Sequence, residues 1–208
     1  YFGRWKALHY AARRFFAPVL VSPVDDGAAV KIWGISDRRT ATAAHLSLRL
    51  LDFTGRELWR RDVDVHLPAN TSNLITAIAK REILAGQDPK KVVLVTELTE
   101  AGKRLSRNTL LFTKAKELDL PAADIHTDVE ARPDGAFTLR LTARHFARDV
   151  LLSTTSAAGV PVVDGFFEDN AFDLFPGETA TVVFRPRTAS SVAAVQAAVR
   201  ATSLVDSY

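Results

Sequence analysis

The sequence predicts an all-β protein, in which two tandem immunoglobulin-like antiparallel β-sandwiches follow a short N-terminal helix. Three observations support this fold class. Apolar residues recur with a helical period near the start of the chain, and from residue 19 onward they alternate with polar residues. Clusters of Asp, Asn, Gly and Pro separate the alternating runs, as turns separate strands. About seven such runs precede residue 114, which is the strand count of one immunoglobulin-like sandwich.

Residues 3–16 are expected to form the N-terminal helix. Trp5, Leu8 and Phe15 fall on one face at helical spacing. Pro18 ends the pattern, since proline cannot continue the hydrogen-bond ladder of a helix. A single helix with large aromatic side chains on one face must pack against another surface.

The first sandwich is expected to occupy residues 18–117. Its predicted strands lie at residues 19–24, 29–35, 44–53, 57–67, 74–79, 91–98 and 105–113. The third strand shows the alternation clearly, because Leu46, Leu48 and Leu50 all point to one face. Residues 80–86 are expected to form a helical turn that Gly86 closes.

The second sandwich is expected to occupy residues 118–208, after a linker that contains Pro121. Residues 1–17 then form a separate helical segment in front of both domains. The strands expected in this half lie at residues 125–131, 136–144, 149–155, 178–186 and 201–206, with a helix at 189–199.

Composition excludes several classes of function. The net charge is +3 and the charges of both signs are interleaved, so the chain lacks the dense basic stripe of a nucleic-acid-binding protein. No apolar run approaches about 18 residues, so we expect no membrane span. Cysteine is absent, which excludes disulfides and thiolate metal sites. Methionine is absent as well, and with the helical start this predicts that the chain is a piece of a longer protein.

Two groups of polar residues could bind a metal ion. Asp62, Asp64 and His66 alternate along one strand and share a face, although a solvated face is the simpler interpretation. The segment 164–178 holds five oxygen donors that could surround calcium, namely Asp164, Glu168, Asp169, Asn170 and Asp173. The alternative, which we favour, is that Asp169 and Asn170 shape a turn, anchored to the core by Phe166, Phe167, Phe172 and Phe175.

Other candidates are isolated. Trp33 and Trp59 could stack on sugar rings, but their neighbours favour core packing or cover by arginine side chains. Asn70 fits the glycosylation tripeptide, and a turn explains it equally well. The remaining histidines are scattered singly at positions 9, 45, 126 and 145. No nucleophile, phosphate-binding or zinc-protease motif occurs, and no pair of carboxylates stands out, so the sequence assigns no catalytic, cofactor or metal residue.

Four stretches, in order, resemble the C-terminal part of the β-mannosidases of glycoside hydrolase family 2. YFGRWKALHYAARRFFAPVLVS (1–22) is similar to the last helix of that family's catalytic (β/α)8 barrel. LRLLDFTGRELWRRDVDVHLPANTS (48–72) resembles the first accessory sandwich, and LSRNTLLFTKAKELDLP (105–121) resembles the join between the two. EDNAFDLFPGE (168–178) resembles the Asp-Asn-x-Phe-Asp-Leu-x-Pro-Gly-Glu signature of the terminal sandwich. Related exo-glucosaminidases share this architecture.

The resemblance implies a non-catalytic fragment of an exo-acting, retaining β-mannosidase that releases terminal β-linked mannose with two carboxylates. The catalytic glutamates would lie on barrel strands before Tyr1, so none is carried over to this chain. The expected partners are that barrel and the oligosaccharide substrate of the parent; the alternative function is a carbohydrate-binding module. The oligomeric state stays open, and the expected compartment of the parent is the bacterial cytoplasm or periplasm. Without the barrel, residues 3–16 are expected to fray, fold back on the first sandwich or pair with a second copy.

Overall fold

The computed structural model describes residues 5–155 and 162–207, and it contains two compact units. One unit runs from Arg14 to Asp119. The other is discontinuous in sequence, because it combines the chain up to Arg13 with the chain from Leu120 onward. Strands dominate both units and pair antiparallel throughout, which confirms the all-β prediction.

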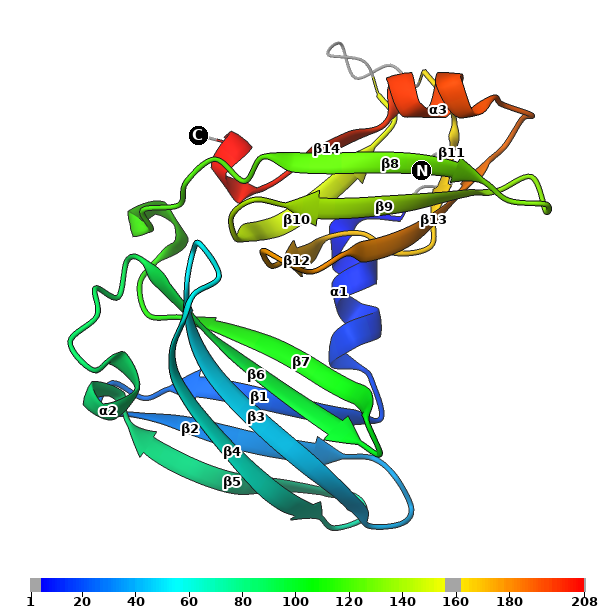
Figure 1. Cartoon of the computed structure of the whole chain (residues 1–208). Helices are drawn as coiled ribbons and strands as arrows, with labels where there is room; N and C mark the ends of the chain where they lie inside the picture. Colours follow the sequence, from blue (N-terminus) through cyan, green and yellow to red (C-terminus); the bar gives the residue numbers. More distant parts are fainter. Residues whose placement is uncertain (1–4, 156–161, 208) are drawn as a thin grey trace. The chain divides into compact units, whose positions relative to one another are not determined.

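The unit Arg14–Asp119 is a sandwich of seven strands in two sheets (Figure 1). The three-stranded sheet has the order β1 (Val19–Asp25), β2 (Ala29–Ser36) and β5 (Thr71–Ala79). The four-stranded sheet has the order β4 (Glu57–Leu67), β3 (Thr42–Asp52), β6 (Val92–Glu100) and β7 (Lys103–Leu111). Each strand overlaps one that the sequence predicts.

The core of this sandwich is built from alternating residues of both sheets. Leu46, Leu48 and Leu50 of β3 are fully buried, as predicted, and they pack in one cluster with Val21 of β1 and Ile32 of β2. The short helix α2 (Lys80–Leu84) and the 3-10 turn η1 (Ala115–Glu117) complete the unit. Helix α2 differs in detail from the prediction, because Ala85 already adopts the left-handed conformation and closes the turn one residue before Gly86.

The terminal sandwich, residues 120–207, also has two sheets. The larger has the order β11 (Gly165–Phe167), β13 (Ala180–Pro186), β9 (Phe137–Ala143) and β8 (Ile125–Ala131). The smaller has the order β12 (Phe172–Leu174), β10 (Ala147–Ser153) and β14 (Arg200–Thr202). Helix α3 (Val192–Ala198) and the 3-10 turn η2 (Leu204–Ser207) follow β13 and β14.

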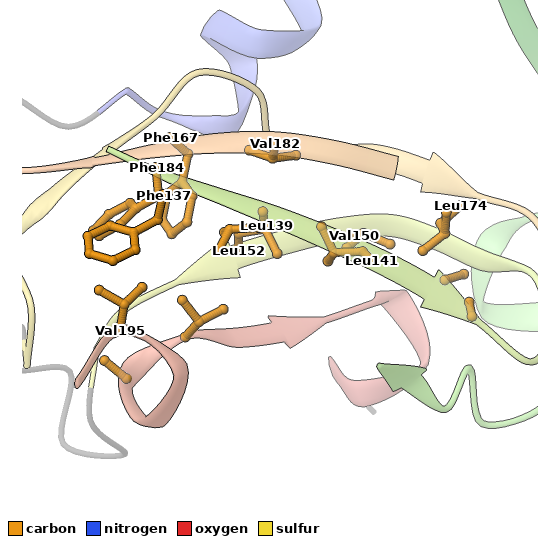
Figure 2. Packing of buried hydrophobic residues seen from close by; sticks show 14 of the residues in the cluster. Phe137, Leu139, Leu141, Val150, Leu152, Phe167, Leu174, Val182, Phe184 and Val195 are labelled. Carbon is orange, nitrogen blue, oxygen red and sulfur yellow. The ribbon is translucent and has the colours of Figure 1, made fainter. Parts of the chain in front are cut away.

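Figure 2 shows the core of the terminal sandwich. Leu139 and Leu141 of β9, Val150 of β10 and Phe184 of β13 are fully buried within it. Val195 reaches the same cluster from helix α3, which begins where the Ser191 hydroxyl accepts a hydrogen bond from the Ala194 N–H at 3.1 Å. The apolar face of this alanine-rich helix therefore closes one side of the core.

Two sequence expectations for this half are wrong. Strands β11 and β12 lie inside the segment 164–178, where no strand is predicted, because each has only three residues and shows no sustained alternation. The closing strand predicted at 201–206 ends at Thr202, and a 3-10 turn follows.

Helix α1 (Ala7–Phe15) is shorter than the predicted helix 3–16, of which residues 3 and 4 lie outside the described range. Tyr10 is the buried residue of α1, while Leu8 and Phe15 of the predicted apolar face are exposed. The expectation that the helix folds onto the first sandwich is wrong, because its residues up to Arg13 pack on the terminal sandwich. Fraying and pairing with a second copy stay predictions. None of the described helices is long and apolar enough to cross a membrane.

Candidate functional site

Asn170 organises the segment 164–178 from within the terminal sandwich. Its side chain is 5% exposed, and its amide oxygen accepts hydrogen bonds from the N–H groups of Leu152 at 2.7 Å and Ala171 at 2.9 Å. Its amide nitrogen donates to the carbonyl of Leu152 at 2.9 Å. The side chain thus forms hydrogen bonds with β10 as a neighbouring strand would, beyond the last backbone pair of β10 and β12, which joins Val150 and Phe172.

The carboxylates of the same segment face arginines. Glu168 accepts a hydrogen bond from Arg185 at 2.7 Å, and Asp173 accepts one from Arg148 at 2.7 Å. Two further acidic residues form ion pairs as well, Asp164 with Arg187 at 2.9 Å and Asp169 with Arg13 at 3.3 Å. Oxygen atoms that face guanidinium groups are poor ligands for calcium, and the described residues hold no group of three or more acidic or histidine side chains suited to a metal ion. This geometry supports the turn interpretation.

The four phenylalanines of the segment divide between two roles. Phe167 and Phe175 are buried, and their rings lie 4.8 Å from those of Phe184 and Phe146 respectively. Phe172 packs at the margin of the core. Phe166 does not anchor the core, and its ring instead meets that of Trp5 edge-on at 5.2 Å.

Helix α1 contacts the same segment through two side chains, beside the contact that Trp5 makes just before the helix. The Tyr10 hydroxyl donates a buried hydrogen bond of 2.9 Å to the carbonyl of Phe167, and the Arg13 guanidinium donates one of 2.9 Å to the carbonyl of Glu168. Burial raises the pKa of Tyr10, with a smaller contribution from the nearby Asp169 carboxylate. Tyr10 was overlooked at the sequence level, because it lies off the face that Trp5, Leu8 and Phe15 define.

A small pocket opens beside this contact. Its volume is about 90 Å³, and its walls include Trp5, Tyr10, Phe166, Thr154 and Asn170. The Thr154 hydroxyl already donates to the carbonyl of Val163 at 2.6 Å, and the Asn170 amide is bonded to Leu152. Small-molecule sites usually measure roughly 300–1,000 Å³. The pocket is therefore a gap beside the helix contact rather than a built ligand site.

Asp62, Asp64 and His66 point outward from β4, as predicted, but the residue that joins the carboxylates is His45 on the adjacent β3. Its Nδ1 lies 2.9 Å from Asp64 and its Nε2 lies 3.4 Å from Asp62. The two carboxylates sit on opposite sides of the imidazole ring and do not converge on a common point. The hydrogen bond to Asp64, with a further contribution from Asp62, raises the pKa of His45.

Asp62 is held ionised by a second neighbour. Arg60 donates to it at 2.6 Å, and this hydrogen bond lowers the pKa of the Asp62 carboxyl. The face of β4 is thus a ladder of charged pairs on the edge strand of its sheet. Charged side chains on an edge strand discourage pairing with other chains.

The remaining candidates have structural partners. Trp59 packs at the margin of the first core with the Arg61 guanidinium 5.9 Å from its ring centre, and Trp33 is half-buried on β2. Asn70 lies in a turn with a positive φ of 49°. The other histidines lie at separate places: His9 is 5.9 Å from the Trp5 ring, His126 contacts Asp128 at 3.1 Å, and His145 contacts the carbonyl of Ala122 at 2.8 Å.

The fold and these contacts define a class of protein: a tandem pair of immunoglobulin-like sandwiches whose polar clusters build turns and ion pairs. Family models describe the two halves separately. A mannosidase Ig/CBM-like domain matches residues 28–117, and an Ig-fold domain matches residues 120–207. The chain belongs to the C-terminal immunoglobulin-like domains of the family 2 glycoside hydrolases of the β-mannosidase type.

Relatives and solved structures agree with this assignment. The β-mannosidase of Mus musculus is 28% identical over 100% of this chain, and β-mannosidase A of Aspergillus terreus is 26% identical over 88% of it. The chain spans only 24% and 21% of these two proteins. Among solved structures, the β-D-mannosidase of Dictyoglomus thermophilum covers 95% of the chain with a TM-score of 0.76 at 18% identity, and the chain covers 23% of it. The exo-chitosanase of Amycolatopsis orientalis covers 94% with a TM-score of 0.64 at 20% identity, and the chain covers 26% of it.

Proposed function

We propose that this chain is the non-catalytic C-terminal part of a retaining exo-glycosidase of the β-mannosidase type, which hydrolyses terminal β-D-mannosides. One observation carries the proposal: two accessory-domain models match in order along the chain, and the relatives of which it spans about a quarter are named β-mannosidases. In retaining enzymes of this kind, one carboxylate attacks the sugar and another donates and then removes a proton. Both would lie in the preceding catalytic barrel.

The chain's own contribution is to brace that barrel. Helix α1 leaves large apolar side chains exposed away from its contact with β11, with Leu8 68% and Phe15 50% exposed. Burying a large apolar side chain contributes about 1.5–3 kcal/mol. A neighbouring barrel would supply the surface that covers them, as expected if α1 is the last barrel helix.

The carboxylates of the described residues support a role without chemistry. A glycosidase acid needs a proton near neutral pH, which requires an apolar or like-charged environment that raises its pKa. The carboxylate clusters in the described residues have the opposite character, because arginines lie beside the carboxylates. The pKa values of Asp62 and Asp134 are lowered by their neighbours, Asp62 chiefly by Arg60 and Asp134 chiefly by the N–H of Ala136 and by Arg185.

The test is to express the longer chain, including the coding sequence that precedes Tyr1, and to assay it on p-nitrophenyl β-D-mannoside. We expect hydrolysis with retention of the anomeric configuration. A matched protein that ends before residue 14 should lose activity or thermal stability, since it lacks both sandwiches. Full activity and unchanged stability of that shorter protein would contradict the bracing role.

A second parent activity is supported by the solved structures. Complexes of the Amycolatopsis orientalis exo-chitosanase with p-nitrophenyl β-D-glucosamine show the same tandem fold, at TM-scores of 0.61. The parallel assay therefore includes p-nitrophenyl β-D-glucosaminide. Preferential hydrolysis of that substrate would assign the parent to the exo-glucosaminidases and would leave the accessory role of this chain unchanged.

A further inference from the structure

We propose that the outer edge of strand β11 is a receptor surface for helix α1, so that the terminal sandwich is fastened to a segment far earlier in the chain. The bonded residues Tyr10 and Phe167 are 157 positions apart in sequence. We call this contact the helix clamp; it consists of Trp5, Tyr10 and Arg13 on one side and residues 166–169 on the other.

The position of β11 explains why a partner is needed. It is the first strand in the order β11-β13-β9-β8, so among the described residues only one of its sides is paired with another strand. An edge strand presents backbone groups that lack a partner strand, and proteins commonly cover such edges with a helix or loop. Helix α1 supplies this cover for the terminal sandwich.

Two donors of the clamp bind consecutive backbone carbonyls. Tyr10 donates to the carbonyl of Phe167 and Arg13 donates to that of Glu168, both at 2.9 Å. Tyr10 is only 3% exposed, so its hydroxyl would lie without a partner in a dry environment if the contact were absent. Leaving a buried polar group unpaired costs about 1–3 kcal/mol, which makes this contact specific as well as favourable.

Two further contacts fix the register of the helix on the edge. Arg13 also forms an ion pair with Asp169 at 3.3 Å. Its guanidinium therefore binds both the carbonyl of Glu168 and the carboxylate of the next residue. Near the other end of the contact, just before the first residue of α1, Trp5 packs edge-on against Phe166 and lies 5.4 Å from the Tyr10 ring. The aromatic contact lies at one end of the clamp and the charged contact at the other, so neither a shift nor a reversal of the helix would satisfy both.

The consequence for the parent rests on the proposed function. If α1 is the last helix of the catalytic barrel, the clamp joins the terminal sandwich directly to the barrel and does not depend on the intervening sandwich. The segment 168–178 then has a second role besides its internal turn: its first two residues recognise the barrel helix.

Hydrogen exchange of the full 208-residue chain tests the clamp without reference to any activity. In Tyr10→Phe, which keeps the ring, we expect the amides of residues 10–13 to exchange about fivefold faster, as loss of one buried hydrogen bond predicts. Arg13→Gln should accelerate the same amides. Lys6→Gln is the matched control, because Lys6 is exposed and lies on the same segment. Equal protection of the helix in Tyr10→Phe, Arg13→Gln and the wild type would overturn the proposal.

A second pair of variants tests which unit holds the helix. Leu139→Ala weakens the core of the terminal sandwich, and Leu48→Ala weakens that of the other unit, both at fully buried positions. If the clamp holds the helix, the protection of its amides from exchange should fall in Leu139→Ala and stay unchanged in Leu48→Ala. This holds even if the substitution unfolds its own unit completely. The reverse pattern would refute the clamp. These hydrogen-exchange measurements do not depend on hydrolysis. Failure of the clamp can therefore be distinguished from failure of the glycosidase assignment.

Discussion

Replacing Asn170 by alanine should destabilise the terminal sandwich more than any other single polar substitution in the segment 164–178. The amide of Asn170 bonds both the N–H and the C=O of Leu152, together with the N–H of Ala171. Leu152 is itself buried in the core strand β10. Alanine cannot replace these bonds, and the buried site gives water little access.

The expected loss follows from the number of bonds. A net contribution of about 1 kcal/mol for each of the three hydrogen bonds gives a loss of about 3 kcal/mol. The free energy of unfolding of small domains is only about 5–15 kcal/mol. For most wild-type stabilities in that range, the variant should still fold at room temperature. With a urea dependence of about 1–3 kcal/mol/M, the unfolding midpoint of this unit should fall by about 1–3 M.

The assay is urea unfolding read by pulsed hydrogen exchange, with peptides from each unit followed separately. Gln196→Ala is the matched control, because its exposed amide makes a hydrogen bond to the carbonyl of Thr127 in the same unit. That control should change stability by no more than about 0.5 kcal/mol. A midpoint for Asn170→Ala equal to that of Gln196→Ala would refute the view that this side chain replaces a strand.

Three further predictions concern single groups. Gly165→Ala should cost the terminal sandwich about 1–3 kcal/mol or prevent its folding, because the added methyl group would overlap the ring of Phe184; urea unfolding measures this. His45 should titrate above the ordinary pKa of 6.5 in an NMR experiment, and Asp64→Asn should lower that pKa. Because its folded pKa is raised, the stabilisation from protonated His45 is complete below 6.5 and is lost as the pH rises through the raised value. Tyr10 should ionise above 10.0 in an ultraviolet titration, and Tyr10→Phe should abolish that late step.

Each of these has an outcome that would count against it. Gly165→Ala with wild-type stability would mean that β11 and β13 can separate at no cost. For His45, the control is Asp128→Asn, which lies in the other unit and should leave its pKa unchanged; an equal effect of both substitutions would indicate a general charge effect. If the late ionisation step is still seen in Tyr10→Phe, that step belongs to a tyrosine other than Tyr10.

The sequence predicts those elements whose stability comes from their own alternation. Strand β4 occupies residues 57–67 and β8 occupies residues 125–131, both as predicted, because polar and apolar side chains alternate along residues 62–67 of β4 and along the whole of β8. Strands β11 and β12 could not be found this way. They are held by single neighbours and by the side chain of Asn170, and such long-range contacts leave no periodic pattern.

The same limit applies to the candidate sites. His45 lies between Asp62 and Asp64 because of the register of β3 on β4, which no single strand encodes. The contact of helix α1 with the terminal sandwich could not be predicted, because Tyr10 contacts an edge strand 157 positions later. The aromatic residues of 164–178 were correctly expected to anchor a turn, except that Phe166 packs against Trp5 of the clamp.

The most direct test of the account is the activity of the purified 208-residue chain on p-nitrophenyl β-D-mannoside, measured beside the longer chain that includes the preceding coding sequence. We expect no turnover above background by the 208-residue chain and clear turnover by the longer one. Turnover by the 208-residue chain that persists through further purification would contradict the claim that these two sandwiches are accessory domains without chemistry of their own.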